Sequence, residues 1–234
     1  MNGEIHQLDQ FRNQSFIFAD RSEAGRTLGL MLQPEYEHIE EGMVLAIPSG
    51  GVPVGLRVKE ILGLPFDLMI VRKLQIPGNP EAGFGAMMLN GTVFYNERLL
   101  SELRLRPGQI DAEKERVGAE LEKRNLLFRK GRPFPDLSGK RVILVDDGLA
   151  SGFTMLASIA MAKKANPRET IVAVPTAPQR TVDRIRPEVN KIYCANIRTT
   201  ATFAVAEAYQ DWYDLSEQEV LDMLVDRGSP RDPS

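Results

Sequence analysis

Two adjacent carboxylates, Asp146 and Asp147, carry the clearest chemical signal in the chain. They follow an apolar run at residues 142–145 and precede a loop of mostly small residues. In an open α/β sheet, ligands bind beyond the carboxyl ends of the strands. Small residues let the backbone approach such a ligand, and the amides of a helix expected from residue 154 favour a phosphate. Because carboxylates alone would repel a phosphate, we interpret the acid pair as ligands for ribose hydroxyls or for Mg²⁺.

Other interpretations of this segment are weaker. A capped turn, with Asp147 or Ser151 at the N-cap, would explain a bare acid pair. A receiver domain also begins with an apolar strand and two acids, but it needs about 100 further residues, more than follow Asp147. A nucleotide-binding P-loop needs an earlier glycine and a Ser or Thr after its lysine, and the nearest candidate, Ser138-Gly139-Lys140, has neither.

The elements that must position the acid pair alternate along the chain. Short apolar runs, typical of buried parallel strands, alternate with helix-compatible segments at residues 54–62 and 154–164. The predicted class is therefore α/β, with a doubly wound, mainly parallel sheet and helices on both faces. The apolar runs occupy residues 43–47, 66–71, 141–145, 170–174 and 191–194.

Two segments depart from this alternation within what we expect to be one domain over residues 1–234. Residues 75–91 are dense in Gly and Pro, which predicts a long mobile loop leading into a hairpin at Asn90-Gly91. Residues 107–130 are rich in charge and predict an inserted surface helix, for which the role of a connector is favoured. Ser216 and Glu219 form a capping-box pattern for a last helix.

Composition excludes several function classes. The 234 residues carry a net charge of -3, so the chain lacks the basic excess that is typical of nucleic-acid-binding proteins, and no nucleic-acid partner is expected. The one cysteine, Cys194, cannot form an internal disulfide and is expected to be buried, and two histidines do not make a multi-histidine metal site. Without a signal-like start or an apolar stretch of about 18 residues, no membrane association is expected, and the predicted location is cytoplasmic.

Residues 142–154 resemble the signature of type I phosphoribosyltransferases, which bind 5-phosphoribosyl-1-pyrophosphate. The shared pattern is four apolar residues, two acids, three mostly small residues, then Ser/Thr-Gly-x-Thr. The resemblance to one bacterial and archaeal subgroup covers most of residues 16–226. The segments that carry it are Phe18-Ala19-Asp20-Arg21, residues 46–52, Val71-Arg72-Lys73, residues 77–81, Arg132-Pro133 and residues 209–224.

The resemblance implies a role for each matching residue. Asp146 and Asp147 would hold the ribose hydroxyls with Mg²⁺ nearby, and Arg72 and Lys73 would neutralise the pyrophosphate. Residues 75–91 would form the closing lid. The loop around the 5-phosphate would consist of Gly148, Leu149, Ala150, Ser151, Gly152, Phe153 and Thr154. The pyrophosphate loop would comprise Pro48, Ser49, Gly50 and Gly51, with the non-proline cis peptide that is common in relatives.

Three positions depart from the family pattern. Ser49 stands where this subgroup more often has Arg, so pyrophosphate binding is expected either to be weaker or to depend on Arg72 and Lys73. Ala150 replaces an Asp that acts as a base in some purine enzymes. Val174-Pro175-Thr176 lacks the Lys that 6-oxopurine enzymes present to the purine, which argues against guanine and hypoxanthine.

The expected activity is Mg²⁺-dependent transfer of the phosphoribosyl group to a nitrogen acceptor, commonly a nucleobase, with release of pyrophosphate. A non-catalytic sensor of the same donor or of a nucleotide is the alternative, and hydrolysis or the reverse reaction is a third. A homodimer is possible for this family. The C-terminal aromatic residues are expected to belong to the core rather than to stack on a base; they are Phe203, Tyr209, Trp212 and Tyr213.

Overall fold

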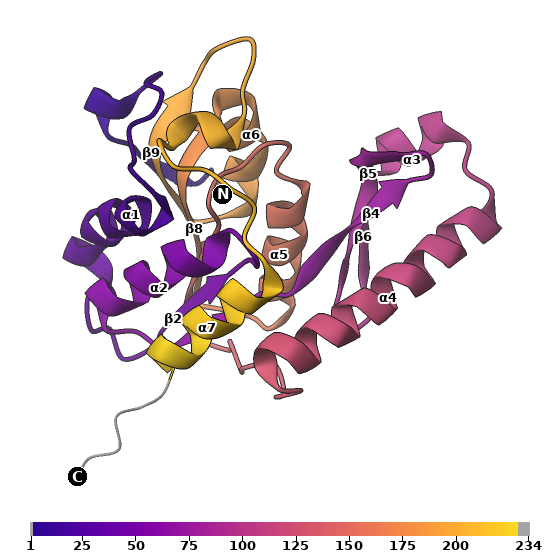
Figure 1. Cartoon of the computed structure of the whole chain (residues 1–234), viewed down its shortest axis with the longest axis horizontal. Coiled ribbons are helices and arrows are strands. Elements are labelled where there is room, and N and C mark those ends of the chain that lie inside the picture. Colours follow the sequence, from indigo (N-terminus) through magenta and orange to yellow (C-terminus); the bar gives the residue numbers. More distant parts are fainter. Residues whose placement is uncertain (1, 229–234) are drawn as a thin grey trace.

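A six-stranded parallel sheet forms the centre of the computed structural model, which describes residues 2–228. Residue 1 and residues 229–234, although included in the predicted domain, lie outside the described residues. Every pair of neighbouring strands in the sheet is parallel. The predicted α/β class is confirmed (Figure 1). In spatial order the strands are β1 (Glu4–His6), β9 (Lys191–Arg198), β8 (Glu169–Pro178), β7 (Arg141–Val145), β2 (Gly42–Ala46) and β3 (Phe66–Leu68).

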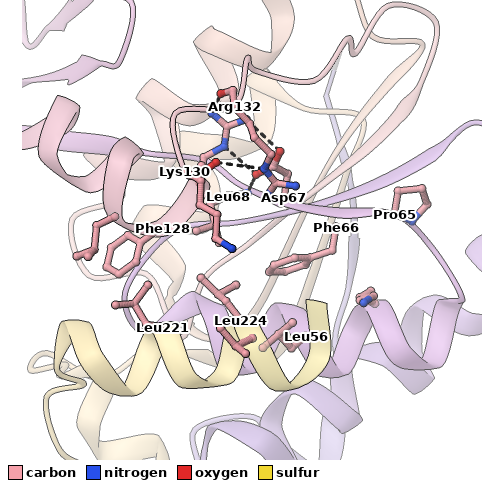
Figure 2. Close-up of a pocket in the computed structure, with 14 residues that line it drawn as sticks. Leu56, Pro65, Phe66, Asp67, Leu68, Phe128, Lys130, Arg132, Leu221 and Leu224 are labelled. Carbon is pink, nitrogen blue, oxygen red and sulfur yellow. Dashed lines mark hydrogen bonds and ion pairs between the residues drawn. The ribbon is translucent and has the colours of Figure 1, made fainter. Parts of the chain in front are cut away.

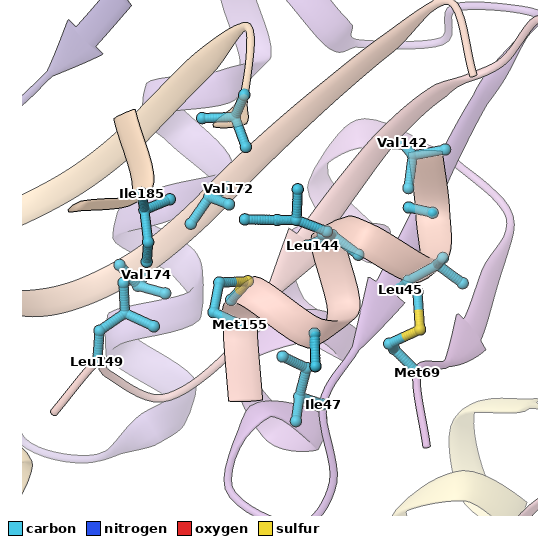
Figure 3. Packing of buried hydrophobic residues seen from close by; sticks show 14 of the residues in the cluster. Leu45, Ile47, Met69, Val142, Leu144, Leu149, Met155, Val172, Val174 and Ile185 are labelled. Carbon is cyan, nitrogen blue, oxygen red and sulfur yellow. The ribbon is translucent and has the colours of Figure 1, made fainter. Parts of the chain in front are cut away.

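Helices cover both faces of this sheet, as a doubly wound fold requires. Along β7, Ile143 and Val145 pack with α1 (Arg21–Tyr36) and α2 (Gly51–Leu62). Val142 and Leu144 pack on the opposite face with α5 (Phe153–Lys164) and α6 (Gln179–Ile185) (Figure 3). Cys194 is buried in the second cluster, as predicted. Residues 142–145 of β7 are fully buried, with successive side chains packed on opposite faces of the sheet. This packing fixes the position of the strand end, where Asp146 follows.

A second, antiparallel sheet and two helices project from one side of the core (Figure 1). We call residues 71–129 the hood. It contains β4 (Val71–Ile76), β5 (Asn79–Met88), β6 (Val93–Tyr95), α3 (Glu97–Leu103) and α4 (Pro107–Arg129). The charged helix expected at residues 107–130 is α4, and it packs on β4 through Leu74, Val117 and Leu121.

The prediction of a long loop over residues 75–91 is wrong, because most of this range belongs to β4 and β5. The hairpin expected at Asn90-Gly91 is present, since the Gly91 amide donates to the Met88 carbonyl at 2.9 Å. Gly83 and Gly85 serve close strand packing: side chains there would overlap Lys73 and the Phe94 carbonyl. Whether the segment closes as a lid stays a prediction.

The apolar run at residues 66–71 is also divided differently from the prediction. β3 ends at Leu68, and Val71 already belongs to β4 of the other sheet. The buried residues Met69 and Ile70 join the two strands, so one continuous apolar run crosses from core to hood. A run of this kind reports burial but not the sheet to which each residue belongs.

The C-terminal segment returns to the start of α1. The amides of Gln210 and Asp211 donate to the carbonyls of Phe18 and Ala19 at 2.8 and 2.9 Å. Beyond it lies α7 (Glu217–Gly228), whose start carries the predicted Ser216–Glu219 capping contact. Short 3-10 helices occupy Asp9–Phe11, Arg186–Glu188 and Val205–Ala208. Among the described residues, no helix is long and apolar enough to cross a membrane.

Candidate active site

Two loops meet where the neighbouring strands β2 and β7 end. The Ile47 amide donates to the Val145 carbonyl at 2.9 Å, which ties the start of one loop to the start of the other. A side chain on Gly50 would overlap the Asp147 carboxylate, and one on Gly51 would lie 2.8 Å from the Val145 carbonyl oxygen. The peptide bond between Pro48 and Ser49 is cis, as the resemblance implies. The loops expected to hold pyrophosphate and ribose are therefore in direct contact.

The acid pair is largely enclosed. The Asp147 amide donates to Asp146 Oδ1 at 2.9 Å, which turns the Asp146 carboxylate back toward the chain. Burial raises the pKa of Asp146, and the neighbouring charge of Asp147 raises it further. Burial also raises the pKa of Asp147, but Arg21 opposes that rise. The two adjacent carboxyls thus occupy different electrostatic environments.

Arg21, at the first turn of α1, holds the side chain of Asp147. Its Nε lies 2.9 Å from Asp147 Oδ2, and a second donor reaches the Tyr213 carbonyl at 3.0 Å. Its guanidinium lies 3.9 Å from the centre of the Trp212 ring. The Tyr209 hydroxyl donates to the Asp147 carbonyl at 2.6 Å. Asp147 is therefore fixed at both its carboxylate and its backbone by elements from the two ends of the chain.

These contacts to Asp147 were not predicted from the sequence, and Arg21 was given no role. A local signal was available, because Asp20 caps α1 and Glu23 follows three residues later. That pattern would have predicted the helix start, although not the partner of Arg21. The expectation that the aromatic residues belong to the core holds for Tyr209, which is 1% exposed, but is wrong for Tyr213, which is 46% exposed.

The loop after the acid pair is held mainly through its backbone. The Leu149 side chain is buried in the core and its amide donates to the Thr176 carbonyl at 3.0 Å, so Leu149 positions the loop. The carbonyls of Ala150 and Ser151 accept from Thr181 Oγ1 and from Arg184 at 2.7 and 2.8 Å. Gly152 has φ +80°, a left-handed conformation that leads into α5.

The amides that open α5 have no side-chain cap. Gly152 occupies the N-cap position and has no side chain to offer the first turn. The peptides that start the helix, those of Phe153 and Thr154, lie at the carboxyl end of β7, beyond the acid pair. The first turn of α5 therefore has the chemistry of an anion site next to carboxylates.

Arg72 and Lys73 do not lie beyond the end of a core strand, as predicted, but within β4 of the hood. Successive side chains of a strand point to opposite faces. Arg72 faces α4, where it contacts both carboxylate oxygens of Glu120 at 2.6 and 3.4 Å. Lys73 lies on the other face, against Gly83. The two cations therefore cannot both address one ligand from the same side.

The carboxylates fit a shared rather than a caged magnesium ion. Among the described residues, no group of three or more His, Cys, Asp or Glu side chains could hold a metal. Mg²⁺ is commonly held by one or two carboxylates together with oxygens of a phosphate ligand and water. Asp146 and Asp147, next to a loop expected to bind phosphate, match this combination of two carboxylates with ligand oxygens and water.

Comparison with known proteins agrees with this arrangement. The profile of the phosphoribosyl transferase domain family matches residues 29–212. Two curated sequences from Mycobacterium tuberculosis strains, provisionally named phosphoribosyl transferases, are each 34% identical over 210 residues. These matches cover 89% of this chain but 46% of each relative, so the chain spans about half the length of these relatives.

Structural comparison agrees with the sequence matches. The crystal structure of the protein TT1426 from Thermus thermophilus has a TM-score of 0.74 and 32% sequence identity, with 89% of this chain and 98% of that chain covered. The fold, the contact between the two loops and the family profile point the same way. The chain belongs to the phosphoribosyl transferase domain family.

Proposed function

We propose that the protein transfers the 5-phosphoribosyl group of 5-phosphoribosyl-1-pyrophosphate to a nitrogen acceptor and releases pyrophosphate. The observation that carries this proposal is the contact of the 47–51 loop with the acid pair at the ends of β2 and β7. In the 47–51 loop the amides of Ile47 and Gly51 donate to the carbonyls of Val145 and Ile47. The amides of Ser49 and Gly50 are therefore those proposed for a ligand, and the uncapped start of α5 offers amides after the acid pair. A donor with a phosphate at one end, a diphosphate at the other and a ribose between them has the matching order of groups.

Each part of the site then has a task. Asp146 and Asp147 accept hydrogen bonds from the ribose hydroxyls, and amides of the loop at residues 150–154 bind the 5-phosphate. The amides of Ser49 and Gly50 bind the pyrophosphate, while the Gly51 amide donates to the Ile47 carbonyl and holds the loop. Arg21 keeps the Asp147 carboxylate oriented toward the ribose.

The reaction breaks the bond between ribose C1 and the pyrophosphate oxygen and forms a bond from C1 to the acceptor nitrogen, which loses a proton. Positive charge grows on the ribose as pyrophosphate leaves, and the preorganised carboxylates and amides stabilise that separation of charge. Bound Mg²⁺, held by Asp146 and Asp147 with ligand oxygens, would supply further neutralisation of the diphosphate. Closure of the hood over the ligand would exclude water.

The acceptor is proposed to be a nucleobase. Val174-Pro175-Thr176, expected to follow the strand where 6-oxopurine enzymes present a lysine, lies within β8, which continues to Pro178, and Val174 and Thr176 are fully buried. The set of acceptors to be tested therefore has to extend beyond guanine and hypoxanthine to adenine, pyrimidines and small amines.

Pyrophosphate release, measured for a panel of acceptors with and without EDTA, tests the proposal. We expect one acceptor to give Mg²⁺-dependent release and Asp146→Asn to abolish it. Asp111→Asn, on the exposed surface of α4, is the matched control and should leave the rate unchanged. Donor binding in calorimetry without release for any acceptor would instead establish the alternative, a sensor of the donor. Absence of donor binding would refute both functions.

A further inference from the structure

A cavity of about 660 Å³ lies where the hood meets the core, apart from the acid pair. Its walls come from α2, β3, α7 and the C-terminal end of α4 with the turn that follows (Figure 2). The lining includes no residue of the 47–51 loop or of residues 146–154. Cavities of about 300–1,000 Å³ are typical of small-molecule sites. The size of this cavity therefore suits a small molecule, and its lining separates it from the acid pair.

Most of the lining is aliphatic or aromatic. Leu221 and Leu224 of α7 and Leu56 of α2 face β3 across the cavity, and Phe66 and Phe128 lie on its two sides (Figure 2). Val225, which also lines the cavity, is 64% exposed. Leu56 and Phe128 are 1% and 6% exposed and form the floor of the cavity, whereas Phe66, Leu221 and Leu224 are only partly buried by the described residues. An apolar ligand body would cover the part of this surface that those residues leave open.

The buried polar groups in the wall of the cavity already form hydrogen bonds with one another. Arg129 has a fully buried side chain, and each of its five N–H groups has an acceptor. These acceptors are both Asp67 carboxylate oxygens, Asn125 Oδ1 and the carbonyls of Arg132 and Pro133. A nucleobase in the cavity would need partners for its polar edge, and Arg129 and Asp67 have little left to offer.

The rim carries positive charge. Lys130 follows α4 directly and Arg132 lies two residues further; both are exposed and line the cavity, and Arg132 Nε donates to the Arg129 carbonyl at 3.2 Å. Figure 2 places Lys130 over the space between β3 and α7. Among the described residues that line the cavity, Asp67 is the one carboxylate, and its ion pair with Arg129 neutralises it. A local positive charge on a chain of net charge -3 favours an anionic group at this rim.

We propose that this cavity binds a small amphipathic carboxylate, with its apolar chain against the leucines and phenylalanines and its carboxylate at Lys130 and Arg132. The proposal does not rest on the phosphoribosyl transfer proposed above, because the two sites share no lining residue. The cavity lies beside α2, whose first residue, Gly51, contacts the acid pair. Leu56 lies five residues further along that helix, about 7.5 Å away.

Calorimetry of the full chain with decanoate, used as a monomer, tests the proposal. Decanoate should bind with one site per chain, and decyltrimethylammonium, which has the same chain but the opposite charge, should not. Lys130→Gln should weaken decanoate binding about tenfold through loss of a charge-assisted contact. Leu224→Ala should weaken it about fivefold through loss of apolar contact.

Matched controls are Lys164→Gln at the exposed end of α5 and Leu30→Ala, a 51% exposed leucine on α1. Neither should change binding, and thermal unfolding of each variant verifies its fold. Equal binding of the anion and the cation, or decanoate affinity unchanged in both cavity variants, would overturn the proposal. Competition by AMP for the decanoate site would overturn the chemical class. The proposal would also be overturned if the protein were a dimer that Leu224→Ala dissociates but decanoate does not. The cavity would then belong to the contact with a second copy of the chain.

Discussion

Replacing Arg21 by alanine should destabilise the protein and damage the ribose side of the site together. The side chains of Arg21 and Asp147 are 8% and 15% exposed, so this ion pair is mostly removed from water. Breaking a buried pair by deleting one partner costs about 3–5 kcal/mol, because the other charge stays buried. Burial raises the pKa of Asp147, so the unpaired carboxyl can take up a proton, which limits the loss. We expect the free energy of unfolding to fall by about 3 kcal/mol, of which the contact with Trp212 contributes about 0.5–1 kcal/mol.

Urea unfolding at pH 7 measures this change, and Arg26→Ala is its control, because Arg26 is an exposed arginine of the same helix. The control should change stability by no more than about 0.5 kcal/mol. Arg21→Lys should recover part of the loss, since it keeps the charge but not both hydrogen bonds. In calorimetry, Arg21→Ala should weaken binding of ribose 5-phosphate much more than binding of pyrophosphate, because Asp147 is assigned to the ribose. A loss below about 1 kcal/mol, or equal weakening of both ligands, would refute the role given to Arg21.

Three further outcomes follow from the geometry. Gly50→Ala should abolish donor binding in calorimetry, because its side chain would displace the Asp147 carboxylate, whereas Gly108→Ala, in open space, should bind normally; normal binding by Gly50→Ala would disprove the contact between the loops. Lys73→Ala should weaken pyrophosphate binding more than Arg72→Ala, because the two side chains point to opposite faces of β4 and that of Arg72 faces α4; the reverse order would show that Arg72 turns to the ligand. The hydrogen bond from Arg72 lowers the pKa of Glu120, so this pair stabilises the protein above the unfolded-state value of about 4.3 and stops doing so as pH falls through the lowered value. Urea unfolding of Glu120→Gln should therefore differ from wild type at pH 7, and the difference should shrink as the pH falls below about 4.3, whereas a constant difference would contradict this account.

The central strands and the acid pair could be predicted from local features of the sequence. β7 has the predicted bounds, and the Asp-Asp loop that follows it leads into α5 as expected. The hood strands were missed because Gly83 and Gly85 suggest a loop until their cross-strand neighbours are known. Arg21 was missed because its partner lies 126 residues away in the sequence. A single sequence reports the preference of each segment, whereas ion pairs of this kind depend on which distant segments meet.

The ion pair of Arg129 fixes the C-terminal end of α4 to the core, whereas the N-terminal end of this long helix lies far from that contact. Arg129 is the last residue of α4 and is bound to Asp67 of β3, while β4 enters the hood only three residues after β3 ends. Both chain connections between the hood and the core therefore lie at one end of the hood, and β4, β5 and β6 also contact α5 of the core (Figure 1). With 23 residues, α4 is about 34 Å long, so a rotation of about 10° around the Arg129 end would carry Pro107 through about 6 Å. Such a rotation would also have to change the packing of the hood strands on α5, so the Asp67–Arg129 ion pair is one of several contacts that set the position of the hood relative to the core.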